Sequence, residues 1–532
     1  MNDKIFLASL ALVCGTDRVH AEDGSDKMNV LLIMIDDMKP NLGCYGDPVA
    51  LTPNIDSLAA RGTVFLNNFC QQALSGPSRA SMLTGLRPDN LTVWNVEKIR
   101  TVYPGIVTLP EYFRANGYET AGTGKVFDLR TVDDRCDGPS WSIPFVSEQS
   151  SINPAYGKPA MGYQNPETKA AIRGATEEVG KTDLKGNARS QYIKVRSAPA
   201  VECLDLPDDA YNDGAIASIG IGLLDRMAAS DKPFFLAVGF KRPHLPFIAP
   251  RRYWDLYDRA SMPLAPFQQK PANAEEIAFS PYMEILTYSD IPPLHTFSDI
   301  HENNGVIDSD KQRELIQGYY ACISYVDAQV GRVMEALRRS GADKNTVVVL
   351  LGDHGWHLGD HGIWAKHTNF EQASHAPLII SYPGAKGATT HGISEFVDLY
   401  PTLCSMAGIP VPAHLDGDDL TPVVKEGATP AKRYAVSQYT RAKGVMGYSI
   451  RDERYRYTVW FNDNYRTTRR YDGNKVIATE LYDYVCDPLE KVNHVHEKEY
   501  ASVRARMHEL LQEHIACQNE RGETHRKRRG IE

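Results

Sequence analysis

Long apolar runs rich in branched residues recur along much of the chain. They cover residues 29–35 (NVLLIMI), 233–240 (PFFLAVGF) and 346–351 (TVVVLL). Runs of this length without polar alternation predict strands buried on both faces, as in a parallel sheet. A helical pattern ends at Gly117, and the residues after it, 119–123, are expected to begin a further strand.

Helical patterns alternate with these runs. They are expected at residues 54–61, 78–84, 109–116 and 312–339. Asn54 is expected to cap the first of them. The alternation predicts an α/β fold with a mostly parallel sheet covered by helices on both faces. Residues 129–210 and 260–310 are richer in Gly, Pro and polar residues and are expected to be long insertions.

The pattern changes after about residue 425, where shorter segments replace the buried runs. Antiparallel strands are expected at 436–439, 447–450 and 455–460, with a closing helix at 502–514. The chain is therefore predicted to have a large domain at 28–425 and a smaller α+β subdomain at 426–532.

The first residues have the organisation of a secretory leader. Lys4 precedes a short apolar run, and Ala21 ends a small-residue cleavage pattern. Residues 1–21 are therefore predicted to be a signal peptide of a secreted or periplasmic protein. Cys14 leaves a lipid anchor as the less favoured alternative. No other stretch has the run of about 20 apolar residues that a membrane span needs.

Composition narrows the class of protein. Hydrophobic residues make up 42% of the 532 residues and charged residues 23%, as in a soluble globular protein. The formal net charge of −9 argues against a general nucleic-acid-binding protein. The basic segment 525–529 is expected to be a short solvated end.

Polar residues follow three of the predicted strands. They are Asp36 and Asp37, Arg242 and His244, and Asp353 and His354. In α/β sheets, ligand sites gather at the carboxyl ends of the strands. Either acid of the first pair could alone be a turn or helix cap, but adjacent carboxylates at the end of an apolar strand repel each other and favour a bound cation.

A turn lies between the first two of these strands, in the segment Ser75-Gly76-Pro77-Ser78-Arg79. A residue just before the helix that follows would face its positive end, which suits an anionic group. Taken alone, the segment is only a turn. Its position between acidic strand ends favours an anion-binding or catalytic role.

The same segment, with Leu83-Thr84-Gly85 behind it, resembles the signature of the sulfatase family. In that family the first Cys or Ser of a C/S-x-P-x-R motif is oxidised to formylglycine. Further segments resemble the iduronate-2-sulfatase branch, so that the likeness runs from about residue 28 to 495. They are GKVF at 124–127, FLAVGFKRPHLPF at 235–247, GDHGWHLGDHGIWAK at 352–366 and MGYSIRDERYRYTVW at 446–460. ELYD at 480–483, with Asp487-Pro488, resembles the C-terminal sulfatase pattern.

The resemblance implies an alkaline-phosphatase-like fold, with a large mixed, mostly parallel sheet between helices and a smaller C-terminal α+β subdomain. Residues 28–425 would then be the catalytic domain of a sulfuric ester hydrolase. It also implies that Ser75 becomes formylglycine (3-oxoalanine) and that one divalent cation is held by Asp36, Asp37, Ser75, Asp353 and His354. The hard oxygen donors suit Ca²⁺ or Mg²⁺, and Ca²⁺ is expected, although His354 is a softer ligand than usual.

Further roles follow from the resemblance. Arg79, Lys125 and Lys366 would supply positive charge to the sulfate oxygens. His244 would protonate the departing sugar oxygen. Each residue also has a plainer explanation, because a lysine is usually a solvated surface charge and a histidine between prolines can be a packing residue.

The chain departs from the family pattern at two positions. The family has a histidine three residues after the lysine of the GK motif, whereas this chain has Asp128. Three explanations stay open: Asp128 has altered protonation, another group such as His357 or His361 serves, or the enzyme is slow. Ser75 replaces the more common Cys, and family members with Ser depend on a radical-type formylglycine-generating maturation enzyme.

Basic and aromatic residues in the matched loops are expected to bind the substrate. They are Arg242, His357, His361 and Trp364, with Lys241, Asp360 and Arg451 nearby. Such a rim suits a uronate carboxylate and a sugar ring. The resemblance therefore implies a sulfated polysaccharide or oligosaccharide substrate, with 2-O-sulfated uronate first and another sulfate, such as an algal one, as the alternative.

Two other functions compete with this interpretation. A phosphatase or phosphodiesterase of the same superfamily would need further His and Asp ligands for a second metal ion, where this sequence has Arg79, Lys125 and Lys366. A catalytically silent carbohydrate-binding protein would keep Ser75 unmodified. Metal analysis and sulfate release separate these alternatives.

Overall fold

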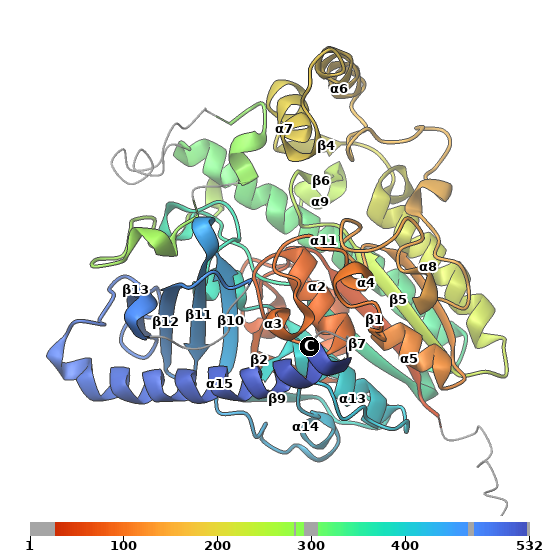
Figure 1. Ribbon diagram of the computed structural model, residues 1–532. Coiled ribbons are helices and arrows are strands. Elements are labelled where there is room, and N and C mark those ends of the chain that lie inside the picture. The colour runs from red at the N-terminus through yellow and green to blue at the C-terminus, as the bar shows by residue number, and fades with distance from the viewer. Residues whose placement is uncertain (1–26, 281–283, 292–306, 467–472, 529–532) are drawn as a thin grey trace, which may run out of the picture.

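The computed structural model describes residues 27–280, 284–291, 307–466 and 473–528 (Figure 1). The predicted signal peptide at 1–21 lies outside the described residues. Among the residues described, no helix combines the length and the apolar character that a membrane crossing requires.

A seven-stranded sheet forms the centre of the molecule, in the order β3-β5-β1-β7-β8-β2-β9. Its strands are β1 (Asn29–Ile35), β2 (Thr63–Phe69), β3 (Glu119–Gly124), β5 (Phe234–Phe240), β7 (Thr346–Gly352), β8 (Leu378–Ser381) and β9 (Ala388–Glu395). β8 runs antiparallel to both of its neighbours, and every other pairing is parallel. The predicted mixed, mostly parallel sheet is confirmed.

Both faces of this sheet are buried, which explains the unbroken apolar runs. On β1, Leu31, Ile33 and Ile35 belong to one core cluster, whereas the alternate residues belong to another. All are inaccessible to solvent. Burying one such side chain contributes about 2 kcal/mol to folding. The first cluster lies under α8 (Asn212–Ala228) and α11 (Ser309–Arg339), and the second under α2 (Ser75–Thr84), α5 (Leu109–Ala115) and α13 (Leu399–Met406).

The expected cap of the first helix is wrong. α1 (Pro53–Ala59) has Thr52 at its N-cap position, and Asn54 lies inside the first turn. The backbone and side-chain nitrogens of Asn54 instead donate to the carboxylate of Asp327 on α11. A carboxylate from a neighbouring helix therefore satisfies the free N–H groups that a local cap would otherwise bind.

A second, four-stranded antiparallel sheet forms the C-terminal part. Its strands are β10 (Ala435–Thr440), β11 (Val445–Arg451), β12 (Tyr455–Asn462) and β13 (Val476–Asp483). The predicted α+β character is confirmed, and β13 is an additional strand. The predicted division after residue 425 falls inside α14 (Thr421–Glu426) and remains a prediction.

The closing helix is longer than predicted. α15 spans Ala501–Arg528 and runs from the second sheet back beneath the first (Figure 1). His525 is buried, with its ring 6.2 Å from that of Tyr103, whereas residues 526–528 are exposed, so of the described part of the expected solvated end only His525 departs from the prediction. The basic residues continue a helix because packing against the large domain holds its last turns.

The first predicted insertion is a folded projection. It contains α6 (Pro166–Val179), α7 (Gly186–Ser197) and β4 (Val201–Leu204), and β4 pairs in parallel with β6 (Phe247–Pro250). The two helices stand above the carboxyl edge of the large sheet (Figure 1). Short α-helices among the described residues are α3 (Pro88–Leu91), α4 (Ile99–Val102), α9 (Arg251–Trp254) and α12 (Glu371–Ser374).

Candidate active site and metal centre

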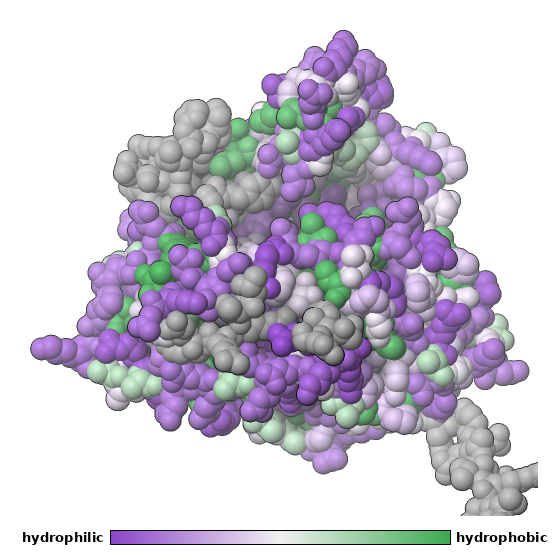
Figure 2. All heavy atoms as spheres, in the orientation of Figure 1, coloured by the Kyte–Doolittle hydropathy of each residue, from purple (hydrophilic) through white to green (hydrophobic). Residues whose placement is uncertain are grey.

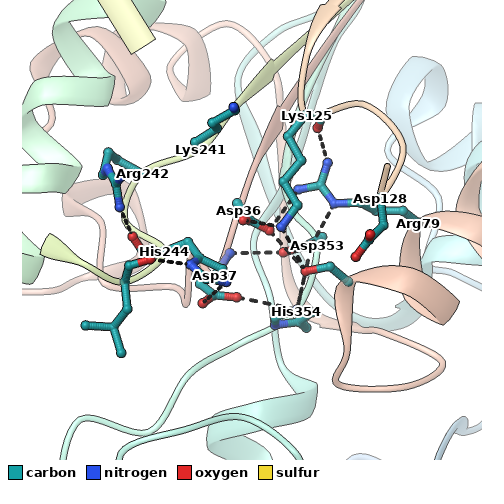
Figure 3. A network of polar contacts seen from close by, with 12 residues as sticks. Asp36, Asp37, Arg79, Lys125, Asp128, Lys241, Arg242, His244, Asp353 and His354 are labelled. Carbon is teal, nitrogen blue, oxygen red and sulfur yellow. Dashed lines mark hydrogen bonds and ion pairs between the residues drawn. The ribbon is translucent and has the colours of Figure 1, made fainter. Parts of the chain in front are cut away.

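The carboxyl ends of three neighbouring strands meet at one polar cluster (Figure 3). The residues expected there are brought together: Asp36 and Asp37 follow β1, Arg242 and His244 follow β5, and Asp353 and His354 follow β7. Because β5, β1 and β7 are adjacent and parallel, their chain ends necessarily point to the same edge.

Ser75 lies at the centre of this cluster and is 2% exposed. Its Oγ is 3.1 Å from Asp36 Oδ1, 3.1 Å from His354 Nε2 and 3.5 Å from Lys125 Nζ. α2 begins at Ser75, so this residue occupies the first helical turn and not the position before the helix. Its hydroxyl still lies at the positive end of that helix.

The turn at the start of α2 depends on Gly76. A Cβ at this position would lie 2.3 Å from the carbonyl oxygen of Asn95, which is a backbone atom that cannot yield. The segment that carries Ser75 is therefore held against a neighbouring loop at a separation only glycine allows.

The three carboxylates converge through an unusual backbone at Asp37. This residue has φ 58, in the left-handed region, and its N–H donates to Asp353 Oδ1 at 3.0 Å. Tyr319 donates to the Asp37 carbonyl at 2.9 Å. Such a conformation costs about 1 kcal/mol and is typical of a functional site.

These groups offer two overlapping sets of metal ligands. Asp36, Asp37 and His244 form one set, in which the possible ligand atoms all lie within 4.8 Å of one another. Asp37, Asp353 and His354 form the other. A cation between them would meet carboxylate oxygens, the Ser75 oxygen and one imidazole, a mainly hard donor set.

The charge balance of the cluster also fits a cation. Burial raises the pKa of Asp37 well above its ordinary value, and Asp36 and Asp353 add to this effect against the attraction of Lys366. Burial acts in the same direction on Asp36, but Lys125, His244 and Arg79 outweigh it and hold that pKa well below normal. Asp37 therefore lies among like charges that its contact with Lys366 does not fully offset, and a divalent cation would stabilise its charged form.

Three cations surround the carboxylates. Lys125 Nζ is 2.5 Å from Asp36 Oδ2, and Lys366 Nζ is 2.7 Å from Asp37 Oδ1. Arg79 is fully buried and bridges Asp353, at 2.8 Å from Nε, and Asp36, at 3.2 Å from Nη2. Its third nitrogen donates to the carbonyls of Lys125 and Val126. Arg79 thus holds the carboxylates and the Lys125 segment together, whereas both lysines reach the cleft.

His244 has one ring nitrogen fixed and the other facing the centre. Its Nδ1 is 2.6 Å from the Leu245 carbonyl, and its Nε2 is 3.7 Å from Asp37 Oδ2 and from Glu284 Oε1. Burial, followed by Lys366, lowers the pKa of His244 to about 3. Since Nδ1 is held by a carbonyl, Nε2 is the atom that exchanges protons with a ligand.

The centre opens into a cleft of about 980 Å³ (Figure 2). Cationic residues that line it are Lys125, Arg130, Lys194, Lys241, Arg242 and Lys366. The cleft is the hollow beneath the projecting α6–α7 pair. Its size suits a ligand larger than a simple ester. The carboxylates of Asp36, Asp128, Glu148 and Glu284 also line it, so the six cations leave a small positive excess that suits an anionic ligand.

Most of the predicted substrate rim does not face this cleft. His357, His361 and Trp364 are at most 3% exposed and are not among the lining residues. His357 Nε2 meets Thr368 Oγ1 at 3.0 Å, and His361 Nε2 meets the Leu489 carbonyl at 2.9 Å. Packing within the protein buries these three side chains away from the cleft, and their role in substrate binding stays a prediction.

Arg242 does line the cleft, but its position limits its role. It is 7% exposed, and its guanidinium donates to the carbonyls of His244 and Pro246. This contact fastens the loop that carries His244. Arg242 is therefore placed chiefly to position that histidine, with little of its surface left for a ligand.

Asp128 is a cleft residue, not a surface loop acid. It is 3% exposed, and its carboxylate is paired with the Arg130 guanidinium at 2.6 Å. Burial raises its pKa, but the hydrogen bond from Arg130 and the charge of Lys125 outweigh this and hold the pKa well below normal. The lowered pKa keeps Asp128 in its ionised form, and His357 and His361 are buried outside the cleft.

Several lining residues had no signal in the sequence patterns. Glu284 lies in the second predicted insertion, and its carboxylate is 3.5 Å from Lys366 Nζ and 3.8 Å from Lys194 Nζ. His367 directly follows Lys366 in the sequence, and this position could have indicated that His367 also lines the cleft. Glu284 and Lys194 come from insertions, where only the folded chain reveals proximity.

Comparison with known proteins agrees with this architecture. The Sulfatase family model matches residues 28–409, and the model of the N-sulphoglucosamine sulphohydrolase C-terminal region matches residues 359–517. Human iduronate 2-sulfatase is 33% identical over 92% of this chain and 94% of its own length.

Solved structures share the fold. A protein in complex with its substrate D-glucosamine-2-N,6-O-disulfate superposes with a TM-score of 0.65 at 22% identity, covering 94% of this chain and 98% of that one. The phosphonate monoester hydrolase of Agrobacterium radiobacter gives a TM-score of 0.68 at 25% identity, covering 92% and 96%. The family match spans most of the chain, and the chain therefore belongs to the sulfatase family of sulfuric ester hydrolases.

Proposed function

We propose that the chain hydrolyses a sulfate ester of a carbohydrate through a formylglycine made from Ser75. The observation that carries this proposal is the position of Ser75 Oγ, which lies 3.1 Å from Asp36 Oδ1 and 3.1 Å from His354 Nε2 at the floor of a cationic cleft. A nucleophile there has anion-binding groups on one side and potential metal ligands on the other.

One Ca²⁺ ion is proposed at the ligand cluster. Asp36, Asp37, Asp353, His354 and residue 75 would hold it. When bound, the ion supplies positive charge that stabilises negative charge developing beside residue 75. The carboxylates already converge, and binding of the ion would require Lys366 to move away from Asp37 and Lys125 from Asp36.

The proposed reaction begins with the hydrated aldehyde of residue 75, which carries two hydroxyl groups. One hydroxyl loses its proton to solvent water, and its oxygen attacks sulfur. As that bond forms, the bond between sulfur and the sugar oxygen breaks. His244, which becomes protonated at Nε2 when the anionic sulfate binds beside it, gives that proton to the departing oxygen, so the sugar leaves as an alcohol. Lys125 and Lys366 offset the charge on the sulfate oxygens.

The second half regenerates the aldehyde. The remaining hydroxyl of residue 75 loses its proton, a carbon–oxygen double bond forms, and the bond from carbon to the sulfated oxygen breaks to release sulfate. Asp128 is ionised, but its carboxylate is paired with Arg130 and is therefore a poor acceptor for this proton. His244, unprotonated after the first half, would take this proton, and Lys125 Nζ, 3.5 Å from Ser75 Oγ, is placed to hold the departing sulfate by its charge.

The substrate class is proposed from the cleft and the relatives. The cations of the cleft suit an anionic carbohydrate, and the human relative is named for iduronate 2-sulfate. A 2-O-sulfated uronate within a glycosaminoglycan is the first candidate, and another carbohydrate sulfate, such as that of an algal polysaccharide, is the alternative. The chain is further proposed to be exported and to require a radical-type maturation enzyme.

Sulfate release by the matured protein tests the proposal. The chain is produced with and without a radical-type maturation partner, and intact mass shows whether Ser75 has lost two hydrogen atoms. Release of sulfate from 2-O-sulfated uronate should require this change and should disappear in Ser75→Ala. Ser81→Ala, a buried serine on the same helix, is the matched control and should stay active.

Two outcomes contradict the proposal. Turnover by Ser75→Ala would show that Ser75 is not the nucleophile. A matured enzyme that cleaves a phosphonate monoester but no sulfated sugar would instead favour the activity named for the Agrobacterium neighbour.

A further inference from the structure

One face of α7 forms a wall of the cleft. Its lining residues are Asn187, Ser190, Gln191 and Lys194, which follow the i, i+3, i+4, i+7 spacing of one helical face. All four are polar. Ile193, on the flank of this face, is buried in the core. The projection that carries α7 therefore presents a continuous polar stripe to the same cleft that contains Ser75.

The stripe begins close to the reaction centre and leads away from it. Lys194 Nζ is 3.8 Å from Glu284 Oε1, and Glu284 Oε1 is 3.7 Å from His244 Nε2. From Lys194 to Asn187 the helix rises by about 10 Å. A ligand with its sulfate at Ser75 could therefore extend along α7 by more than one pyranose ring.

The chemistry of the stripe differs from that of the centre. Lysines stand around Ser75, whereas Asn187, Ser190 and Gln191 offer neutral donors and acceptors. Lys194, the single charge of the stripe, is already engaged by Glu284 and lies 4.9 Å above the Tyr288 ring. These groups match the hydroxyls of an uncharged portion of a sugar chain better than further sulfates.

Apolar side chains complete the cleft. Leu129 and Met161 line it and are 59% and 40% exposed, which is unusual for large hydrophobic residues. Neutral amides beside exposed apolar surface suit the C–H and O–H faces of a pyranose ring.

We propose that the polar stripe of α7 is an outer sugar-binding subsite, and that the substrate is an oligosaccharide or polysaccharide end with at least one sugar beyond the sulfated unit. This inference rests on the proposed sulfatase function and extends it. The subsite contributes affinity for the neighbouring sugar and leaves the chemistry at Ser75 unchanged.

Substrate length tests the subsite. The matured enzyme is assayed on a 2-O-sulfated uronate monosaccharide and on a tetrasaccharide that ends in the same unit. The wild-type kcat/KM should be higher for the tetrasaccharide. In Asn187→Ala/Gln191→Ala the ratio of the two kcat/KM values should fall about 10-fold, because two hydrogen-bonding amides are lost.

Arg196→Ala is the matched control, since Arg196 is an exposed residue of α7 outside the cleft. In this variant the ratio of the kcat/KM values for the two substrates should equal that of the wild type. Equal kcat/KM for both substrates in the wild type, or an unchanged ratio in the double variant, would overturn the subsite. Gln191→Ala alone, expected to lower the ratio about 3-fold, serves if the double variant misfolds.

Direct binding separates this inference from the proposed function. Calorimetry with the desulfated tetrasaccharide should show binding to the wild type and to Arg196→Ala, and at least 10-fold weaker binding to Asn187→Ala/Gln191→Ala. Binding of this kind without sulfate release from any substrate would contradict the sulfatase proposal and retain the subsite. Sulfate release together with equal binding to the wild type and the double variant would contradict the subsite and retain the sulfatase proposal.

Discussion

Arg130 donates to Asp128 with two nitrogens of its guanidinium, from Nε to Oδ1 at 2.9 Å and from Nη2 to Oδ2 at 2.6 Å. This bidentate pair stands where the family pattern has a histidine. Because charge-assisted bidentate pairs are among the strongest hydrogen bonds, Asp128 is held as an ionised, occupied carboxylate. It is better suited to fixing Arg130 in the cleft than to accepting a proton.

Asp128→Asn tests this assignment. Removing the charge should lower kcat by less than about 10-fold, since a carboxylate with such a low pKa is a poor base, and should raise KM as Arg130 loosens. Steady-state kinetics of the matured enzyme measure both parameters. Asp134→Asn, an exposed acid of the same loop, is the control. A loss of kcat as complete as that of Ser75→Ala would make Asp128 an essential base.

Metal removal should destabilise the protein. Removing the ion would leave three buried carboxylates close together with no cation between them. A ligand that binds only the folded state adds about 2.7 kcal/mol of stability when its concentration is one hundred times its Kd. A chelator should therefore lower Tm, and Ca²⁺ should restore it. Asp37→Asn should lose most of the calcium-dependent shift, whereas Asp225→Asn, an exposed acid on α8, should keep it. Equal shifts in both variants would place the ion elsewhere.

Much of the large sheet could be predicted because its strands are buried on both faces. The run at β1 ends where the strand ends, and the acids that follow it reach the site directly. Position along a strand therefore predicted Asp36 and Asp353. Strand geometry leaves little freedom at such ends.

The remaining parts of the site depend on contacts between distant segments. Trp364 lies in a matched motif beside Lys366, yet the lysine reaches the cleft and the tryptophan packs into the core. Sequence proximity to a catalytic residue does not reveal the direction of a side chain in an irregular loop. Glu284 and Lys194 approach His244 only through folded insertions whose polar composition predicted no structure.

Gly239→Ala should displace Lys125. A Cβ on Gly239 would lie 2.2 Å from the carbonyl carbon and oxygen of Lys125, and backbone atoms cannot move aside without shifting the strand. We expect a stability loss of about 3 kcal/mol and a kcat reduced at least 10-fold. Chemical denaturation and kinetics measure these effects.

Gly222→Ala provides the matched control for this substitution. Gly222 lies on α8 with no atom within 4 Å of an added Cβ. Alanine should there stabilise the helix by about 0.5 to 1 kcal/mol and leave kcat unchanged. If Gly239→Ala behaved in the same way, the close approach of β5 to Lys125 would have no role in the site.

Glu284→Gln should lower kcat more than it changes KM. The Glu284 carboxylate is within 3.8 Å of charged or ionisable nitrogens of His244, Lys366 and Lys194, so losing its charge should disorder groups that face the leaving oxygen. A roughly 10-fold loss of kcat is expected. Glu148→Gln removes a carboxylate that pairs with Lys241 in the same cleft, and it should affect KM alone. Identical kinetics for the two variants would leave Glu284 without a specific role.

His514 should make the protein sensitive to mild acid. Burial, followed by Arg87, lowers its folded pKa to about 3, whereas the ordinary value is 6.5. The unfolded chain therefore binds the extra proton first, so stability is lost as pH falls below about 6.5, by about 2 kcal/mol at pH 5. Thermal unfolding from pH 7 to pH 5 should show a smaller drop in Tm for His514→Gln than for the wild type. His391→Gln, at an exposed position, should follow the wild type, and parallel curves for all three proteins would mean that His514 is protonated equally in the folded and unfolded chain.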